Sequence, residues 1–372
     1  MKKIVLLLLI FLVFTSNSYS QKTRKYIRNG FVKYNSDDFQ GAIADYNKAI
    51  DIKPNLEEAY SKRGLAKLGL GDIQGAIADY TKVIEIDPKS GDAYYIRGGA
   101  KSQLGDFQGA IDDYNKAIKL NSKFDKAYFN RGIARSGLGD AQGAIADYSK
   151  AINLNYKFTD AYNNRGLSKM GLGDAKGAIA DYNEAINNDP DFSTSYNNRG
   201  LAKSALGDAK GAIADYNKAI KLNPDFSTAY NNRGFAKTGL GDFQGAIADY
   251  NKAIDINSYF TMAYYNRGVA KLGLGDFQGA ITDNNKAIVI NPMFVEAYLN
   301  MAVAKQQSND LKGAIIDYNK AIEINPNNAK AYFGRGLVRI SLGDKDSGCL
   351  DLNKARELGH NRANELIKEY CK

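Results

Sequence analysis

A single unit of 34 residues repeats along almost the whole chain without a gap. Tyrosine recurs at every 34th residue on both sides of Tyr230, and ten copies keep one register with no insertion or deletion. A fixed period of this length is typical of a solenoid, in which each unit packs only on its neighbours. The ten copies begin at Thr23, Glu57, Gly91, Asp125, Thr159, Ser193, Ser227, Thr261, Val295 and Ala329.

The copy from 227 to 260 shows why each unit predicts two helices. In its first half, Ala229, Tyr230 and Gly234 recur at helical spacing. In its second half, the apolar residues between 246 and 254 fall on one face of a helix. Asp242 directly precedes this second segment and is expected to cap its N-terminus.

Glycine inside the first predicted helix needs a reason, because it costs about 1 kcal/mol relative to alanine there. Nine of the ten copies have glycine at the place of Gly234, and the remaining copy has Ala302. We expect the second helix to pack so closely that no larger side chain fits. Ala246 is then expected to lie opposite Gly234 in the hairpin.

The unit resembles the tetratricopeptide repeat (TPR), whose pattern is W-x2-L-G-x2-Y…A-x3-F…P. Tyr230 stands at the place of the Trp and Tyr250 at the place of the Phe, and Gly234 and Ala246 match the pattern's glycine and alanine. The chain departs from it at Arg233, where the family has Leu, and at Lys237, where it has Tyr. The closing proline is present as Pro54, Pro88, Pro190, Pro224, Pro292 and Pro326.

The resemblance covers Thr23 to about Arg362 and implies an all-α fold. We expect a right-handed superhelical solenoid of ten helix-turn-helix repeats over residues 23–362. A capping helix over residues 361–372 would cover its last apolar face, which has no following repeat. A monomer is expected.

The first twenty residues have the layout of a secretory signal peptide. Lys2 and Lys3 precede an apolar run of 11 residues, and small polar residues follow it. We expect cleavage before Gln21, with an uncleaved anchor as the alternative. The protein is then exported to the periplasm or cell envelope of a Gram-negative bacterium, or secreted, with no integral membrane segment after cleavage. Without the first twenty residues, which contain Lys2 and Lys3 and no acidic residue, the formal net charge of +9 becomes +7. This moderate excess is spread along the chain, apart from a basic cluster at residues 22–33, and together with export it argues against nucleic acid as a partner.

The chain has two cysteines, Cys349 and Cys371, placed symmetrically about a predicted turn at His360. In an antiparallel hairpin that turns there, the two thiols would lie opposite each other. An oxidising compartment favours a disulfide that holds the capping helix. The alternative is two unpaired thiols, with Cys349 in the core.

Equivalent positions of successive copies form ladders of side chains along the repeats, and three ladders stand out. In the first ladder, Asp249 has aspartate counterparts in all ten copies, Lys237 has basic ones in all ten, and Arg233 has arginine ones in eight. Arg233 and Lys237 share a helix face because they are four residues apart. We interpret this ladder as structural ion pairs that fix the register. A basic stripe for an acidic ligand is the alternative.

The second ladder consists of asparagines on the first helix: Asn130, Asn164, Asn198, Asn232, Asn266 and Asn300. An amide can donate to and accept from the main chain of an extended peptide without reading its sequence. The TPR region of O-linked N-acetylglucosamine transferase, without its catalytic domain, is similar here. The alternative is that these asparagines are simply tolerated on a solvated face.

The third ladder lies beside the second and is partly aromatic. It contains the aromatic residues Tyr95, Phe129, Tyr265 and Phe333, and the asparagines Asn163, Asn197 and Asn231. In the groove of a TPR protein these aromatics would be anchors for partner side chains. The alternative is packing against the neighbouring helix.

The sequence lacks the clusters that carry chemistry. His360 is the only histidine, no Cys/His cluster has metal-ligand spacing, and no glycine-rich phosphate loop follows a strand. We therefore expect no enzyme, no cofactor and no metal. The predicted function is a scaffold or adaptor that binds an extended polypeptide along the groove, and the alternative is a glycan or cell-wall binding protein that uses the same Asn and Tyr side chains.

Overall fold

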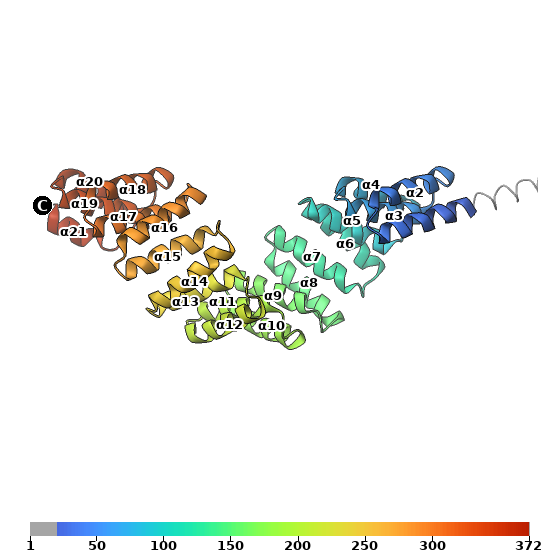
Figure 1. Cartoon of the computed structure of the whole chain (residues 1–372), viewed down its shortest axis with the longest axis horizontal. Helices are drawn as coiled ribbons and strands as arrows, with labels where there is room; N and C mark the ends of the chain where they lie inside the picture. Colours follow the sequence, from blue (N-terminus) through green and yellow to red (C-terminus); the bar gives the residue numbers. More distant parts are fainter. Residues whose placement is uncertain (1–20, 372) are drawn as a thin grey trace, which may run out of the picture. The chain divides into compact units, whose positions relative to one another are not determined.

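The computed structural model describes residues 21–371, and these residues form paired helices with no strand among them. Each 34-residue copy is one pair, a first helix of about 13 residues and a second of about 14, so the all-helical repeat architecture is confirmed. Figure 1 shows the pairs following one another along the chain. The predicted signal peptide and its cleavage point lie outside the described residues or at their edge, and they stay predictions.

The helices fall into two compact units, residues 21–188 and residues 189–371. The first unit contains a helix over residues 21–35, then α2 (Phe39–Ile52), α3 (Glu57–Gly69), α4 (Ile73–Ile86), α5 (Gly91–Gln103), α6 (Phe107–Leu120), α7 (Asp125–Gly137), α8 (Ala141–Leu154), α9 (Thr159–Gly171) and α10 (Ala175–Asn188). The second contains α11 (Ser193–Ala205), α12 (Ala209–Leu222), α13 (Ser227–Gly239), α14 (Phe243–Ile256), α15 (Thr261–Gly273), α16 (Phe277–Ile290), α17 (Val295–Gln307), α18 (Leu311–Ile324), α19 (Ala329–Ser341), α20 (Lys345–Glu357) and α21 (Ala363–Tyr370).

The turn between the two helices is fixed by a Gly-Asp pair in eight of the ten copies, with Asp37 and Asn309 in place of the glycine in the other two. Gly241 has φ of 81°, a left-handed conformation that glycine adopts without strain. Asp242 follows it and caps α14, because its side chain accepts a hydrogen bond from the Gly245 amide at 2.9 Å. The capping role predicted for Asp242 is therefore confirmed.

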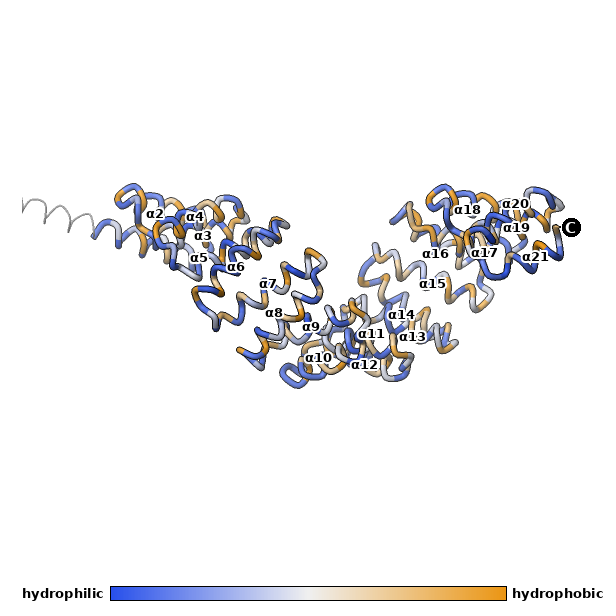
Figure 2. The backbone as a smooth tube through the Cα atoms, turned by 180° about the vertical axis from the view of Figure 1, so that it is seen from behind, coloured by the Kyte–Doolittle hydropathy of each residue, from blue (hydrophilic) through white to orange (hydrophobic). Residues whose placement is uncertain are grey.

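The core of eight of the ten pairs consists of alanines on both helices and one large side chain, the tyrosine at the place of Tyr250; Asn284 and Leu352 take its place in the other two. Ala246, Tyr250 and Ala270 belong to one cluster that spans two neighbouring copies. Tyr250 is fully buried, as are its counterparts in most copies. Figure 2 shows that hydrophobic stretches recur along the helix pairs of both units.

The tyrosine ring explains the glycine of the first helix. A Cβ atom on Gly234 would lie 2.8 Å from a ring carbon of Tyr250, too close for any ordinary contact. The group that excludes a side chain at Gly234 is therefore this ring, whereas the sequence analysis expected the small Ala246 to be the close neighbour.

Two glycines of α9 give a matched test of this packing. Gly166→Ala places a Cβ 2.6 Å from the Tyr182 ring, whereas nothing lies within 4 Å of a Cβ at Gly171. We expect Gly166→Ala to destabilise by about 1–3 kcal/mol through overpacking, despite the better helix propensity of alanine. Gly171→Ala should be neutral or slightly stabilising. Chemical denaturation of both variants checks this, and an equal response would show that the ring moves aside freely.

Candidate functional site

The charged ladder forms a closed network inside each helix pair. The carboxylate of Asp249 accepts a hydrogen bond from Arg233 Nε at 2.9 Å, and Lys237 Nζ lies 2.8 Å from it. Arg233 also donates from Nη1 to Asn217 Oδ1 in the preceding copy, at 2.6 Å. One arginine thus joins two copies, and the sequence analysis did not anticipate its asparagine partner.

In the two copies without the arginine, the lysine alone forms the ion pair with the aspartate. Lys33 lies 2.7 Å from Asp45, and Lys305 lies 2.7 Å from Asp317. Asp317 has Met301 in place of the arginine, and its burial raises its pKa. Every aspartate of this ladder is buried, and the cations of the ladder are directed at these carboxylates inside the helix pair, so they are not arranged as an open basic stripe.

The asparagine ladder is placed between neighbouring copies, where the amides bond to one another. Asn232 Nδ2 donates to Asn197 Oδ1, and Asn266 Nδ2 donates to Asn231 Oδ1, both at 3.0 Å. Buried amides need such partners, because an unpaired one costs about 1–3 kcal/mol. Five asparagines of the two ladders are 4–8% exposed: Asn163, Asn197, Asn198, Asn231 and Asn266.

The other asparagines of this ladder are half-buried. Asn130 Nδ2 donates to the Tyr95 hydroxyl at 3.0 Å, and Asn300 Nδ2 donates to Asn284 Oδ1 at 3.2 Å. Asn164 lines a hollow of the first unit. A bound main chain would therefore meet amides that already take part in contacts between copies, and their direct role in binding stays a prediction, as does the resemblance to the O-linked N-acetylglucosamine transferase groove.

The aromatic residues of the third ladder pack in ring pairs and are half-buried. The rings of Tyr95 and Phe124 are 4.7 Å apart, and those of Phe129 and Phe158 are 4.6 Å apart. Burial raises the pKa of Tyr95. Phe333 stacks on His360 with the ring centres 3.9 Å apart. Their faces are largely used inside the protein, so they do not form a platform of open rings.

A fourth ladder, which the sequence analysis did not single out, is an exposed apolar row on the first helices. It occupies the ninth position of the repeat, counting Ser227 as the first of its copy. Six of its members are 37–60% exposed: Phe31, Ile133, Leu167, Leu201, Phe235 and Val303. The sequence does show that nine of the ten copies have an apolar residue at position nine. It does not show that this position faces solvent.

We call the side chains at positions two, five, six and nine of the first helices the first-helix face. Three hollows open on it. One of about 710 Å³ lies between the helix 21–35 and α3, and one of about 520 Å³ contains Ile133 and Leu167. The third, of about 640 Å³, lies in the second unit and contains Val303, Phe333 and His360. Apolar walls with a few polar groups are typical of sites that receive side chains of a ligand.

The third hollow is closed on one side by the turn that leads into α21. Cys349 and Cys371 are joined by a disulfide across this turn, with Cα atoms 5.7 Å apart, which is the pairing that the sequence predicts. His360 stands in the turn, where burial and the nearby Arg362 and Lys330 lower its pKa. The disulfide thus holds the segment that carries His360 against the last repeat.

Among residues 21–371, no group of three His, Cys, Asp or Glu side chains could hold a metal ion. In the same residues, no helix has the length and apolar character needed to cross a bilayer.

Family models match most of the copies. A model described as TPR repeat matches residues 32–71, 98–139, 204–241 and 306–343. Two models described as Tetratricopeptide repeat match residues 227–260, and residues 57–90, 125–158 and 159–192. Together these segments cover more than half of the chain. No curated protein matches the sequence.

Several solved structures are similar to this chain. A tetratricopeptide repeat protein from Parabacteroides merdae is 21% identical with a TM-score of 0.53, over 67% of this chain and 99% of that one. The APC/C hetero-tetramer Cut9-Hcn1 is 12% identical with a TM-score of 0.52, over 94% and 96%. MamA is 32% identical with a TM-score of 0.44, over 46% and 93%. The helix pairs, the glycine and alanine positions and the family models that match more than half of the chain show that the chain belongs to the tetratricopeptide repeat family.

Proposed function

We propose that this protein is a scaffold in the cell envelope that binds an extended polypeptide along its first-helix face. The observation that supports it most is the exposed apolar ladder at position nine. Exposed apolar residues that recur in register on neighbouring helices suit a ligand that runs across those helices. Proteins of this family generally act as interaction scaffolds, and the repeat is in general not catalytic.

The half-buried aromatic rings support a polypeptide over a glycan. Sugar binding would use open aromatic faces, whereas Tyr95, Phe129 and Phe333 have their rings packed against neighbours. Polypeptide side chains can instead insert beside the position-nine residues. Export, which the N-terminal residues predict, would place this scaffold in the periplasm, at the cell surface or outside the cell.

The test compares two triple variants of the second unit. Leu201→Ser, Phe235→Ser and Val303→Ser together remove the exposed position-nine residues of the second unit. Val289→Ser, Ile316→Ser and Leu350→Ser remove apolar residues that are 66–72% exposed from second helices. Binding is measured on an array of varied peptides of about 15 residues with blocked ends, long enough to cross several helices. Circular dichroism checks that both variants stay folded.

We expect the protein to bind a subset of the array. The first-helix variant should lose about tenfold in affinity, a change of about 1.4 kcal/mol, and the second-helix variant should bind like the unmodified protein. Equal losses in both variants would place the binding elsewhere. Binding of cell-wall oligosaccharides, with no peptide bound, would replace this proposal by the glycan alternative.

A further inference from the structure

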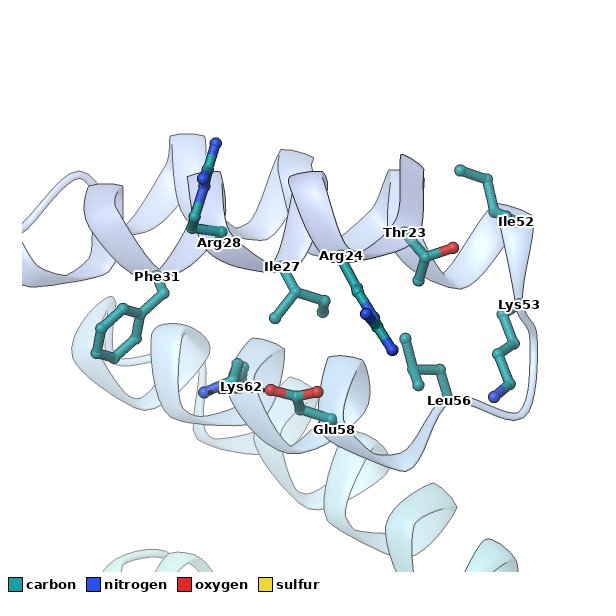
Figure 3. Close-up of a pocket in the computed structure, with 10 residues that line it drawn as sticks. All are labelled: Thr23, Arg24, Ile27, Arg28, Phe31, Ile52, Lys53, Leu56, Glu58 and Lys62. Carbon is teal, nitrogen blue, oxygen red and sulfur yellow. Dashed lines mark ion pairs between the residues drawn. The ribbon is translucent and has the colours of Figure 1, made fainter. Parts of the chain in front are cut away.

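The hollow at the N-terminal end of the first unit differs from the other two in its charge. Figure 3 shows it between the helix 21–35 and α3. Arg24, Arg28, Lys53 and Lys62 line it, and Glu58 is its only acidic residue. An anion that enters this hollow therefore meets an excess of positive charge.

The cations of the first helix are unbalanced within the protein. Residues 21–35 include five basic residues and no acidic one. Lys33 pairs with Asp45, but Lys22, Arg24, Lys25 and Arg28 make no ion pair among the described residues. The first copy has Asn29 at the place of Arg233, so its arginines lie at other positions and take no part in the charged ladder. The exposed guanidinium groups of this helix are thus available to a partner.

The walls between these charges are apolar. Ile27 and Phe31 extend from the helix 21–35 toward α3, and Leu56 closes the far side (Figure 3). Arg24 reaches toward the same gap, whereas Arg28 stands at the rim with its guanidinium turned outward. Lys62 lies with its Nζ atom 5.0 Å from the centre of the Phe31 ring and 3.7 Å from Glu58. The hollow thus offers an apolar floor next to cationic groups.

We propose that this hollow is the subsite for an acidic segment of the bound polypeptide that also carries an apolar side chain. This rests on the proposed function and adds the chemistry of one end of the ligand. The apolar side chain enters between Ile27, Phe31 and Leu56, and carboxylates of neighbouring residues meet Arg24 and Arg28. Such charge-assisted hydrogen bonds are about twice as strong as neutral ones. A lipid surface would need the cations alone and would leave the apolar floor unused.

The test is a titration of the purified protein against two fluorescent peptides with acetylated and amidated ends. One alternates leucine with glutamate and aspartate over about 12 residues, and the other has glutamine and asparagine in their place. We expect the acidic peptide to bind about tenfold more tightly. The double change Arg24→Glu and Arg28→Glu should remove this preference.

A matched control lies on the same helix. The double change Lys22→Glu and Lys25→Glu alters the net charge by the same amount, but neither residue lines the hollow. This variant should weaken binding of the acidic peptide by less than about threefold, because it loses only long-range electrostatic attraction. Phe31→Ser should weaken binding of the acidic peptide with leucines, but not of one with serines in their place.

Three results would overturn the subsite: equal binding of both peptides, equal losses from the two charge-reversing pairs, or binding through Arg24 and Arg28 to phosphatidylglycerol vesicles with no preference for the acidic peptide. If peptides still bind on the position-nine ladder, only the subsite is wrong. If the array described above yields no bound peptide, the proposed function itself fails.

Discussion

Replacing Asp249 with alanine is expected to destabilise the second unit by about 3 kcal/mol, at the lower end of the 3–5 kcal/mol typical when one partner of a buried ion pair is removed. Arg233 and Lys237 would remain close together without their carboxylate. Their side chains are 18% and 23% exposed, so they can be solvated only in part. The hydrogen bond from Arg233 to Asn217 alone would not hold the guanidinium in place.

Hydrogen exchange of the α13 and α14 amides, together with urea denaturation, measures this effect. Asp225→Ala is the control, because Asp225 is exposed and lies outside the network, and it should change stability by less than about 0.5 kcal/mol. A triple change of Asp249→Leu, Arg233→Met and Lys237→Met should recover most of the loss, since a well-packed apolar set can replace a buried ionic one. If Asp249→Ala alone has no effect, the network contributes nothing to the fold.

Reducing the disulfide is expected to release α21 while the repeats stay folded. Ala363 is the only buried residue of this helix, so packing alone holds it weakly. The bond closes a loop between cysteines 22 residues apart, and a loop of this size corresponds to about 3 kcal/mol in the chain-entropy model. The Phe333–His360 stack should loosen with it, because His360 lies in the enclosed loop.

Limited proteolysis with and without a reducing agent checks this expectation. Cleavage within residues 360–372 should become much faster after reduction, and the double variant Cys349→Ser and Cys371→Ser should behave like the reduced protein without any reagent. The helix content of the repeats serves as the internal control. Unchanged protection of α21 in the variant would mean that the turn at His360 holds the helix without the bond.

The repeat architecture could be predicted because its signals are local. The period, the apolar face of each helix and the Gly-Asp turn each act within a few residues, and Asp242 caps α14 as expected. The Arg233, Lys237 and Asp249 network could also be predicted, since antiparallel pairing of two helices in one copy brings these positions together. The disulfide could be predicted for a similar reason, because Cys349 and Cys371 are placed symmetrically about the turn at His360 and so lie opposite each other in a hairpin.

The site was harder to predict, because it depends on how one copy is rotated against the next. A helical period shows which residues share a face, but not whether a neighbouring copy covers that face. Asn197 and Asn232 were therefore expected in an open groove, and they bond to each other instead. Phe235 looked like an ordinary apolar position of the first helix, and it is 60% exposed.

The bonds between copies have one further consequence, which concerns how the length of this protein can change. Arg233 bonds to Asn217, 16 residues earlier, and Asn266 bonds to Asn231, 35 residues earlier. Removing 34 residues from the repeat region would bring equivalent partners together again. Removing 33 would rotate the rest of an interrupted helix by about 100° and turn the donors beyond the cut on that helix away from their partners in the preceding copy. The repeat region can therefore gain or lose length without breaking these bonds only in steps of one whole copy.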